Sequence, residues 1–134
     1  MSPTPLVIDA SVLVPLLMPD DGDDDHGGLD EALRDTAVEI IAPPVIDLEV
    51  INVGAHRRRI GERELVQLTR RLEALPINRF EPRLADVARW SARGLAAYDA
   101  SYAALAEEVD ASVLTHDGDL LDLLPERAIR SFSR

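Results

Sequence analysis

Short apolar runs alternate along the chain with amphipathic stretches, and polar residues, glycine or proline separate them. Apolar runs of this length predict buried strands, whereas apolar residues at a spacing of three and four predict helices. The predicted strands are residues 6–9, 38–42, 76–80, 112–115 and 128–132. The predicted helices are residues 11–17, 29–37, 44–59, 62–75, 82–97 and 99–109, with a short last helix ending at Leu124.

This alternation of strands and helices through short loops indicates an α/β fold. We expect a central parallel sheet with helices on both faces, which is a three-layer α/β/α arrangement. The length of 134 residues suits one domain, residues 1–134, because the sequence has neither an internal repeat nor a linker.

The composition supports a folded protein that is not attached to a membrane. Hydrophobic residues make up 46% of the chain, and none of the apolar runs approaches the ~20 residues that cross a bilayer. The first residues carry no basic region before an apolar stretch, so we expect no signal peptide and a cytoplasmic protein. The absence of cysteine excludes disulfides, thiolate metal sites and a cysteine nucleophile.

The charge of the chain argues against a nucleic-acid partner. Fourteen basic residues face 25 acidic ones, which gives a net charge of −11 that repels a polyanion such as RNA. Bound divalent cations would neutralise part of this excess. All the basic residues are arginine, a bias that a GC-rich genome explains as well as phosphate binding does.

Four acidic residues are the candidates for a functional site. Asp9 ends the first predicted strand, and Asp117 lies two residues after the strand that ends at Thr115. In an open parallel sheet, ligands bind beyond the carboxyl ends of the strands, so these two acids can face one crevice. Glu49 lies beside the apolar stripe of its helix, where a carboxylate is costly unless it is paired or binds a metal. Asp99 begins a predicted helix.

Taken singly, two of these acids are better explained by a structural role. Asp99 alone fits a helix cap, and Asp117 alone fits a turn. Ser11 is expected to be the N-cap of the helix that follows Asp9. Brought together, however, the four carboxylates would repel one another unless a cation such as Mg²⁺ or Mn²⁺ bound between them. Such a site suits the hydrolysis of phosphodiesters.

The chain resembles the PIN-domain ribonucleases in four motifs. Residues 7–14 (VIDASVLV) resemble the opening motif, an acid followed two residues later by Ser or Thr. Glu49 within residues 48–53 resembles the second motif, and residues 98–106 (YDASYAALA) resemble the third. Residues 114–120 (LTHDGDL) resemble the fourth motif, a Thr-x-Asp after a core strand. Size and motif style are similar to the VapC-like toxins of bacterial toxin–antitoxin pairs.

The resemblance implies an endoribonuclease that depends on Mg²⁺ or Mn²⁺ and cuts single-stranded or looped RNA. It also implies a homodimer and an antitoxin protein that inhibits the enzyme. The catalytic carboxylates would be Asp9, Glu49, Asp99 and Asp117, with the metal held by Asp9, Asp99 and Asp117. Ser11 and Thr115 would orient carboxylates or the phosphate, and Asp119 would support Asp117.

Two further stretches are charged. Arg57, Arg58 and Arg59 end one predicted helix, where they either offset the helix dipole or contact the RNA backbone. The acidic loop of residues 20–25 is longer than we expect for such toxins. It does not fit a calcium-binding loop, because His26 stands where glycine is required and Ala32 where the bidentate glutamate belongs. We expect a solvated loop that could also meet a basic segment of the antitoxin.

Other functions remain open at this point. The excess of negative charge favours a non-catalytic α/β module that binds a protein through its acidic surface. A phosphoryl-transfer enzyme with Asp9 as nucleophile would want a second aspartate where Ser11 stands. A phosphate-accepting receiver domain would need a lysine, which the chain lacks.

Overall fold

The computed structural model describes residues 2–20 and 25–133. In these residues the strands are β1 (Thr4–Ile8), β2 (Val38–Ala42), β3 (Ile77–Arg79), β4 (Ser112–Leu114) and β5 (Ala128–Ile129). The helices are α1 (Ala10–Leu17), α2 (Leu29–Arg34), α3 (Val45–Asn52), α4 (Glu62–Ala74), α5 (Leu84–Ala92), α6 (Ala97–Val109) and α7 (Gly118–Leu123). A π-helix, η1 (Val53–Arg57), continues α3.

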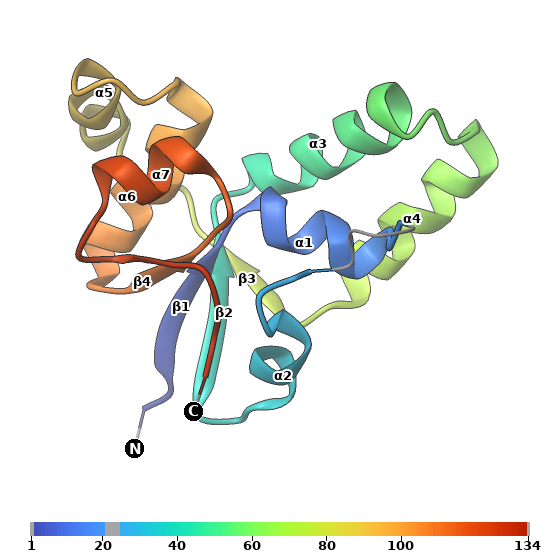
Figure 1. The fold of residues 1–134 in the computed structure, drawn as a ribbon, viewed down its shortest axis with the longest axis horizontal. Helices are drawn as coiled ribbons and strands as arrows, with labels where there is room; N and C mark the ends of the chain where they lie inside the picture. The colour runs from blue at the N-terminus through green and yellow to red at the C-terminus, as the bar shows by residue number, and fades with distance from the viewer. Residues whose placement is uncertain (1, 21–24, 134) are drawn as a thin grey trace.

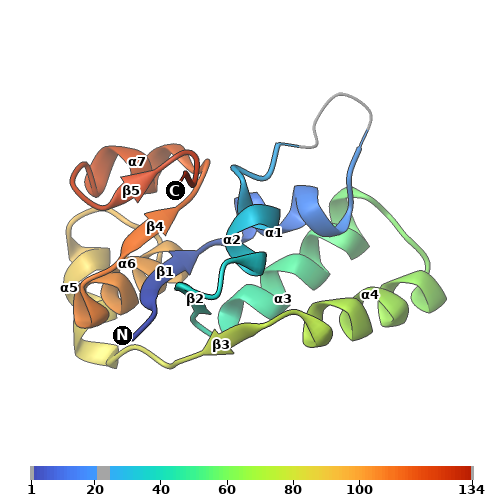
Figure 2. The same ribbon diagram turned by 90° about the horizontal axis from the view of Figure 1, so that it is seen from below.

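The strands form one parallel sheet in the order β3-β2-β1-β4-β5, with β1 at its centre (Figure 1). Figure 2 looks along the sheet and shows α5 and α6 on one face and α1 and α2 on the other. The predicted three-layer α/β/α fold with a central parallel sheet is therefore confirmed.

Burial on both faces explains why the central strand is a continuous apolar run. Leu6, Val7 and Ile8 of β1 are all at most 5% exposed, because neighbouring strands flank β1 and helices cover it above and below. Parallel sheets with two covered faces generally have such runs instead of an alternating pattern. The run ends at Asp9, where the chain leaves the sheet.

The helices α3 and α4 pack as a pair that extends away from the sheet (Figures 1 and 2). The two helices approach closely at Gly54, because a Cβ atom there would lie 3.0 Å from Leu65 Cδ1 and 3.3 Å from Ile60 Cδ1. Leu68 and Leu72 of α4 are buried. Helix α3 and the π-helix η1, but not α4, form one wall of the cavity described below.

Several predicted helix boundaries were wrong, each for a local reason. The helix predicted at residues 29–37 ends at Arg34, because the Asp35 Oδ1 atom accepts a bond from the Ala37 N–H at 2.9 Å and so favours a turn. The helix predicted at residues 82–97 covers only Leu84–Ala92. The predicted helix at residues 44–59 changes to a π-helix at Val53.

The start of α1 also differs from the prediction. The helix begins at Ala10 with Asp9 at the N-cap position, so Ser11 is not the cap. The Ser11 hydroxyl donates to Asp9 instead.

None of the described helices is long and apolar enough to span a lipid bilayer. The acidic loop predicted at residues 20–25 falls mostly on residues 21–24, which lie outside the described residues.

Candidate metal-dependent active site

The site lies at the carboxyl edge of the two central strands. β1 and β4 are neighbours in the sheet, and Ile8 is paired with Leu114 at the end of both. Asp9 and Thr115 therefore leave the sheet side by side, and both are buried. This is the edge at which open parallel sheets bind ligands.

A hydrogen-bonded network holds the Asp9 carboxylate at this edge. The Ser11 hydroxyl donates to Asp9 Oδ1 at 2.6 Å and accepts from the backbone N–H of His116 at 2.8 Å. The Thr115 hydroxyl oxygen accepts from the backbone N–H of Asp117 at 2.9 Å. The network ties the start of α1 to the loop after β4.

Asp99, Asp117 and Asp119 bring carboxylates together across two helices. Asp117 is the N-cap of α7, where its Oδ1 atom accepts from the Leu120 N–H at 3.0 Å. Asp119 lies in the first turn of α7, and Asp99 lies in the first turn of α6. One carboxylate oxygen from each of the three lies within 4.8 Å of the others. Carboxylate oxygens at this spacing can hold a hard divalent cation.

Glu49 reaches the site from α3 on the opposite side. Its apolar neighbours Ile46 and Val50 are fully buried, so the carboxylate stands at the border of the core. The Tyr102 hydroxyl of α6 donates to Glu49 Oε1 at 2.6 Å. The predicted place of Glu49 beside the apolar stripe is what the structure shows.

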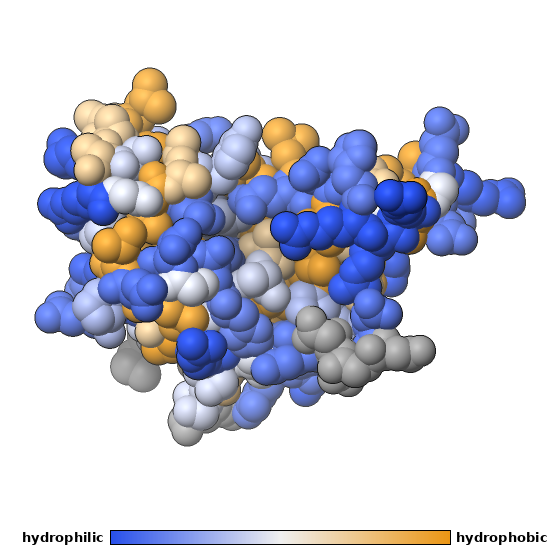
Figure 3. All heavy atoms as spheres, turned by 45° about the horizontal axis from the view of Figure 1, so that its top comes forward, coloured by the Kyte–Doolittle hydropathy of each residue, from blue (hydrophilic) through white to orange (hydrophobic). Residues whose placement is uncertain are grey.

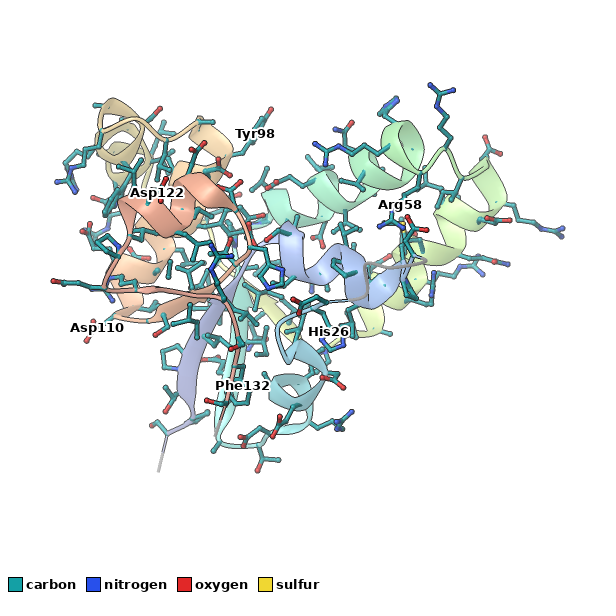
Figure 4. All side chains as sticks on the ribbon, in the orientation of Figure 1. His26, Arg58, Tyr98, Asp110, Asp122 and Phe132 are labelled. Atoms are coloured by element: carbon teal, nitrogen blue, oxygen red, sulfur yellow. The ribbon has the colours of Figure 1, made fainter. Side chains whose placement is uncertain are left out.

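The four predicted catalytic acids, Asp9, Glu49, Asp99 and Asp117, line one cavity of about 770 Å³. Tyr98 and Leu48 also line it, and their side chains are 64% and 67% exposed. In Figure 4, Tyr98 projects from the α6 side of the molecule, whereas Arg58 lies on the α3–α4 side. The face shown in Figure 3 is mainly hydrophilic, with separate small hydrophobic groups.

The concentration of acids changes the proton affinity of each. Burial raises the pKa of Asp9 to about 7, and the charges of Asp117 and Glu49 add to this rise. Hydrogen bonds from Ser11 and Thr115 lower the pKa of Asp9 but do not offset its burial. Burial and the nearby charges of Asp117 and Asp119 raise the pKa of Asp99 to about 6.

The pKa of Glu49 is also raised, first by burial and then by the charges of Asp99 and Asp117, while the bond from Tyr102 lowers it. A cation among these carboxylates would relieve both the burial cost and the repulsion.

The three arginines predicted to contact RNA have different surroundings in the structure. Arg57 lines the cavity and is exposed. Arg58 also lines it, but its guanidinium donates to the Met18 carbonyl oxygen at 2.9 Å and lies 3.7 Å from Asp20. Arg59 has a positive φ of 53° where the helix ends, and it is not among the residues that line the cavity.

Sequence reasoning missed two tyrosines of the third motif. Tyr98 could have been suspected as an aromatic residue next to a site acid. The bond from Tyr102 to Glu49 had no such signal, because it joins residues 53 positions apart on two helices. The prediction that Asp99 opens its helix was also wrong, since α6 begins at Ala97 and Asp99 lies inside the first turn.

Comparisons with known proteins concern the fold and the family of the chain. Among solved structures, the chain is similar to PAE2754 from Pyrobaculum aerophilum, with 25% identity, a TM-score of 0.67, and 94% of this chain and 88% of that chain covered. It also has the fold of VapC20 from Mycobacterium tuberculosis, described as a sarcin–ricin-loop-cleaving toxin. That similarity has 17% identity and a TM-score of 0.66, covering 87% of this chain and 93% of that one. A comparison with curated proteins gives no match.

The family of the chain follows from a match to a family model that covers most of its length. The model of the PIN domain matches residues 6–123, which include all four acids and nearly the whole sheet. The resemblance inferred from the four sequence motifs is thereby confirmed. The chain belongs to the PIN-domain family.

Proposed function

We propose that this protein is a metal-dependent endoribonuclease that cleaves single-stranded or looped RNA and acts as the toxin of a toxin–antitoxin pair. The observation that carries the proposal is the convergence of Asp9, Glu49, Asp99 and Asp117 on one cavity at the carboxyl edge of the sheet. Membership of the PIN family and the fold shared with a VapC toxin support the same activity.

The donor set fits Mg²⁺ or Mn²⁺. These cations prefer oxygen ligands, and the oxygens of Asp99, Asp117 and Asp119 lie within 4.8 Å of one another. Asp9, Asp99 and Asp117 remain the proposed ligands, and the spacing brings Asp119 forward as a further one. A bound cation would supply positive charge against the phosphate oxygens and lower the pKa of a nearby water molecule.

The side chains of the site orient the carboxylates and bind the cation and the RNA. Ser11 and Thr115 fix the Asp9 carboxylate, so its oxygens keep one direction. Asp99 lines the cavity beside Asp117, where both carboxylates would hold the cation. Arg57 provides a guanidinium for a phosphate of the bound strand.

Tyr98 supports a single-stranded substrate. Its ring is 64% exposed at the edge of the cavity, where an unpaired base can stack on it. Tyr98→Ala should raise KM for an unpaired RNA substrate about tenfold with a smaller change in kcat. An unchanged KM would remove Tyr98 from the substrate site.

The deciding experiment is cleavage of a labelled RNA hairpin with Mg²⁺, with Mn²⁺ or with EDTA. The wild type should cut the loop only with a divalent cation, and Asp9→Ala and Asp99→Asn should lower the rate at least about 100-fold. Asp122→Asn is the matched control, because Asp122 is an exposed acid of α7 that does not line the cavity. Equal rates for the wild type and the site variants, or cleavage in EDTA, would contradict the proposal.

The alternative is a non-catalytic acidic module that binds a protein, which the net charge of −11 favours. It predicts no cleavage under any of these conditions. Under the first proposal, the chain acts in the cytoplasm, forms a homodimer and binds a cognate antitoxin. Sedimentation of the purified chain tests the dimer, and inhibition of cleavage by a co-expressed protein tests the antitoxin.

A further inference from the structure

The Glu49–Tyr102 pair is the best-defined contact of the cavity that the family motifs do not explain. Glu49 lies on α3 at the border of the core, and Tyr102 lies on α6 with 0% of its side chain exposed. The hydroxyl oxygen of Tyr102 lies 2.6 Å from Glu49 Oε1. This is a short hydrogen bond between a neutral donor and a carboxylate, which is the stronger class of such bonds.

The geometry of α6 explains why a tyrosine makes this bond. Tyr102 follows Asp99 by three residues, so both side chains lie on one face of the helix. Asp99 reaches the cavity from the first turn, while the Tyr102 ring packs in the core and only its hydroxyl tip meets a polar group. One helix face thus supplies both a site carboxylate and a donor for another carboxylate.

The donor role of Tyr102 is fixed by its surroundings. Burial and the adjacent Glu49 charge raise the pKa of the phenol, so it stays protonated and can only donate to the carboxylate. The charges of Asp99 and Asp117 oppose a charged Glu49, and the bond from Tyr102 favours it. Tyr102 therefore compensates for part of the cost of keeping this carboxylate charged within an acidic cavity.

The bond also sets the direction of the Glu49 side chain. Oε1 is held by Tyr102, and the described residues show no partner for Oε2. Because Glu49 lines the cavity, the second oxygen remains available to a cation or to its water. Without the hydroxyl, the glutamate could turn away from the charges of Asp99 and Asp117.

From this contact we infer that Tyr102 is a positioning residue, whose hydroxyl holds Glu49 for a divalent cation bound in the cavity. The inference rests on the metal site of the proposed function and adds to it a residue outside the acidic set. Partners that orient a carboxylate in this way commonly change metal affinity by about 10- to 100-fold when they are removed.

The test is Mn²⁺ binding to the full chain, measured by isothermal titration calorimetry without RNA. Tyr102→Phe keeps the buried ring and removes only the hydroxyl, so it should weaken Mn²⁺ binding about 10- to 100-fold. Ser101→Ala is the matched control, since it removes a hydroxyl from the adjacent residue of α6, and among the described residues that hydroxyl bonds only to the Ala97 carbonyl oxygen. This control should bind Mn²⁺ like the wild type. Wild-type affinity in Tyr102→Phe would overturn the inference.

Folding of the variants is measured separately from metal binding. Both variants should keep a cooperative urea unfolding transition in EDTA. If Tyr102→Phe does not fold, wild-type protein labelled with ¹³C at tyrosine Cζ provides the second measurement. The chemical shift of Tyr102 Cζ should then change during a Mg²⁺ titration, with the same midpoint as metal binding. An unchanged chemical shift would overturn the inference.

The possible failures can be told apart. Mn²⁺ binding without RNA cleavage would contradict the proposed ribonuclease and leave the role of Tyr102 standing. A wild type that binds no Mn²⁺ would overturn both.

Discussion

Asp9 shows most clearly how one residue links the fold to the site. It ends the central strand, starts α1 as the N-cap and is 5% exposed, so its carboxylate is held away from water. Charging it there costs free energy, and this is why burial raises its pKa to about 7. The buried Asp9 carboxylate is therefore more stable with a bound proton or cation than as an uncompensated charge.

The stability of the metal-free protein should therefore fall as the pH rises. The folded pKa of Asp9 lies above its ordinary value of 3.8, so the folded state binds the proton more tightly than the unfolded state does. The resulting stabilisation is complete below about pH 4 and is lost as the pH rises to about 7. For Asp9 it amounts to no more than about 4 kcal/mol.

Urea unfolding in EDTA at several pH values between 5 and 8 measures this loss. Asp9→Asn cannot be charged, so its free energy of unfolding should fall less over this range than that of the wild type. Added Mn²⁺ should restore wild-type stability at pH 8. Parallel pH profiles for the two proteins would show that Asp9 is not the buried acid that titrates.

Individual residues were predictable where the local pattern determines their surroundings. Asp9 and Glu49 could be selected because an acid at the end of an apolar strand, or beside an apolar helical stripe, is costly without a partner. The partner itself was not predictable in either case. Ser11 was expected to cap a helix, and the partner of Glu49 is Tyr102, which lies 53 residues away on α6, a helix that packs against β1 and β4.

At the scale of elements, the end of the chain is joined to the segment before α2. The Phe132 N–H donates to the Gly27 carbonyl oxygen at 2.7 Å, and a His116 ring nitrogen lies 2.9 Å from the Arg130 carbonyl oxygen. Gly27 has a φ of +63°, a conformation that residues with a Cβ atom adopt at a cost. The strand predicted at residues 128–132 ends at Ile129, but the chain continues along this segment.

Gly27→Ala should destabilise the protein by about 2 kcal/mol or more. A Cβ atom at residue 27 would lie 2.7 Å from the Arg130 carbonyl oxygen, which is backbone and cannot move aside alone. The positive φ adds about 1–2 kcal/mol of backbone strain.

Gly61→Ala is the matched control, because Gly61 has a φ of −75° and, its chain neighbours aside, no atom of the described residues lies within 4 Å of its Cβ position. Its free energy of unfolding in urea should stay within about 0.5 kcal/mol of the wild type. A Gly27→Ala protein as stable as this control would mean that the two segments are not held together.

Elements with strong periodicity were predicted more reliably than their boundaries. The helix at residues 62–75 and the strand at residues 38–42 match α4 and β2 to within one residue. The change from α3 to a π-helix was not predictable, since it depends on the close approach of Gly54 to α4 and on the Arg58 N–H bonding to the Val53 carbonyl. That change places Arg57 and Arg58 along the cavity.

For the whole molecule, the layered architecture could be predicted from the sequence, but the order of the strands in the sheet could not. The alternation of elements predicts parallel strands between two helical layers, and right-handed crossovers limit the topologies. It does not specify that β1 lies between β2 and β4. This adjacency brings Asp9 beside Thr115. Asp9 and Glu49 could be selected from their local pattern, whereas Asp99 and Asp117 could be assigned to the same site only through the family motifs.

The net charge of −11 gives the last prediction, which concerns the entire surface. The cavity that should receive an RNA phosphate is lined by five acidic residues, the four site acids and Asp25, so the metal-free protein should repel its substrate. A bound divalent cation offsets part of the negative charge in the cavity and offers a positive centre to the phosphate, whereas ordinary salt only screens the charge.

Binding of a fluorescent, unpaired oligoribonucleotide can be followed by anisotropy in Ca²⁺, to limit cleavage, and in EDTA with Na⁺ at equal ionic strength. Ca²⁺ should tighten binding at least about tenfold, which is about 1.4 kcal/mol. Asp99→Asn should lose most of this gain, while Asp122→Asn should keep it. Equal affinity in Ca²⁺ and EDTA would mean that arginines such as Arg57, and not a cation among the carboxylates, bring the RNA to this acidic protein.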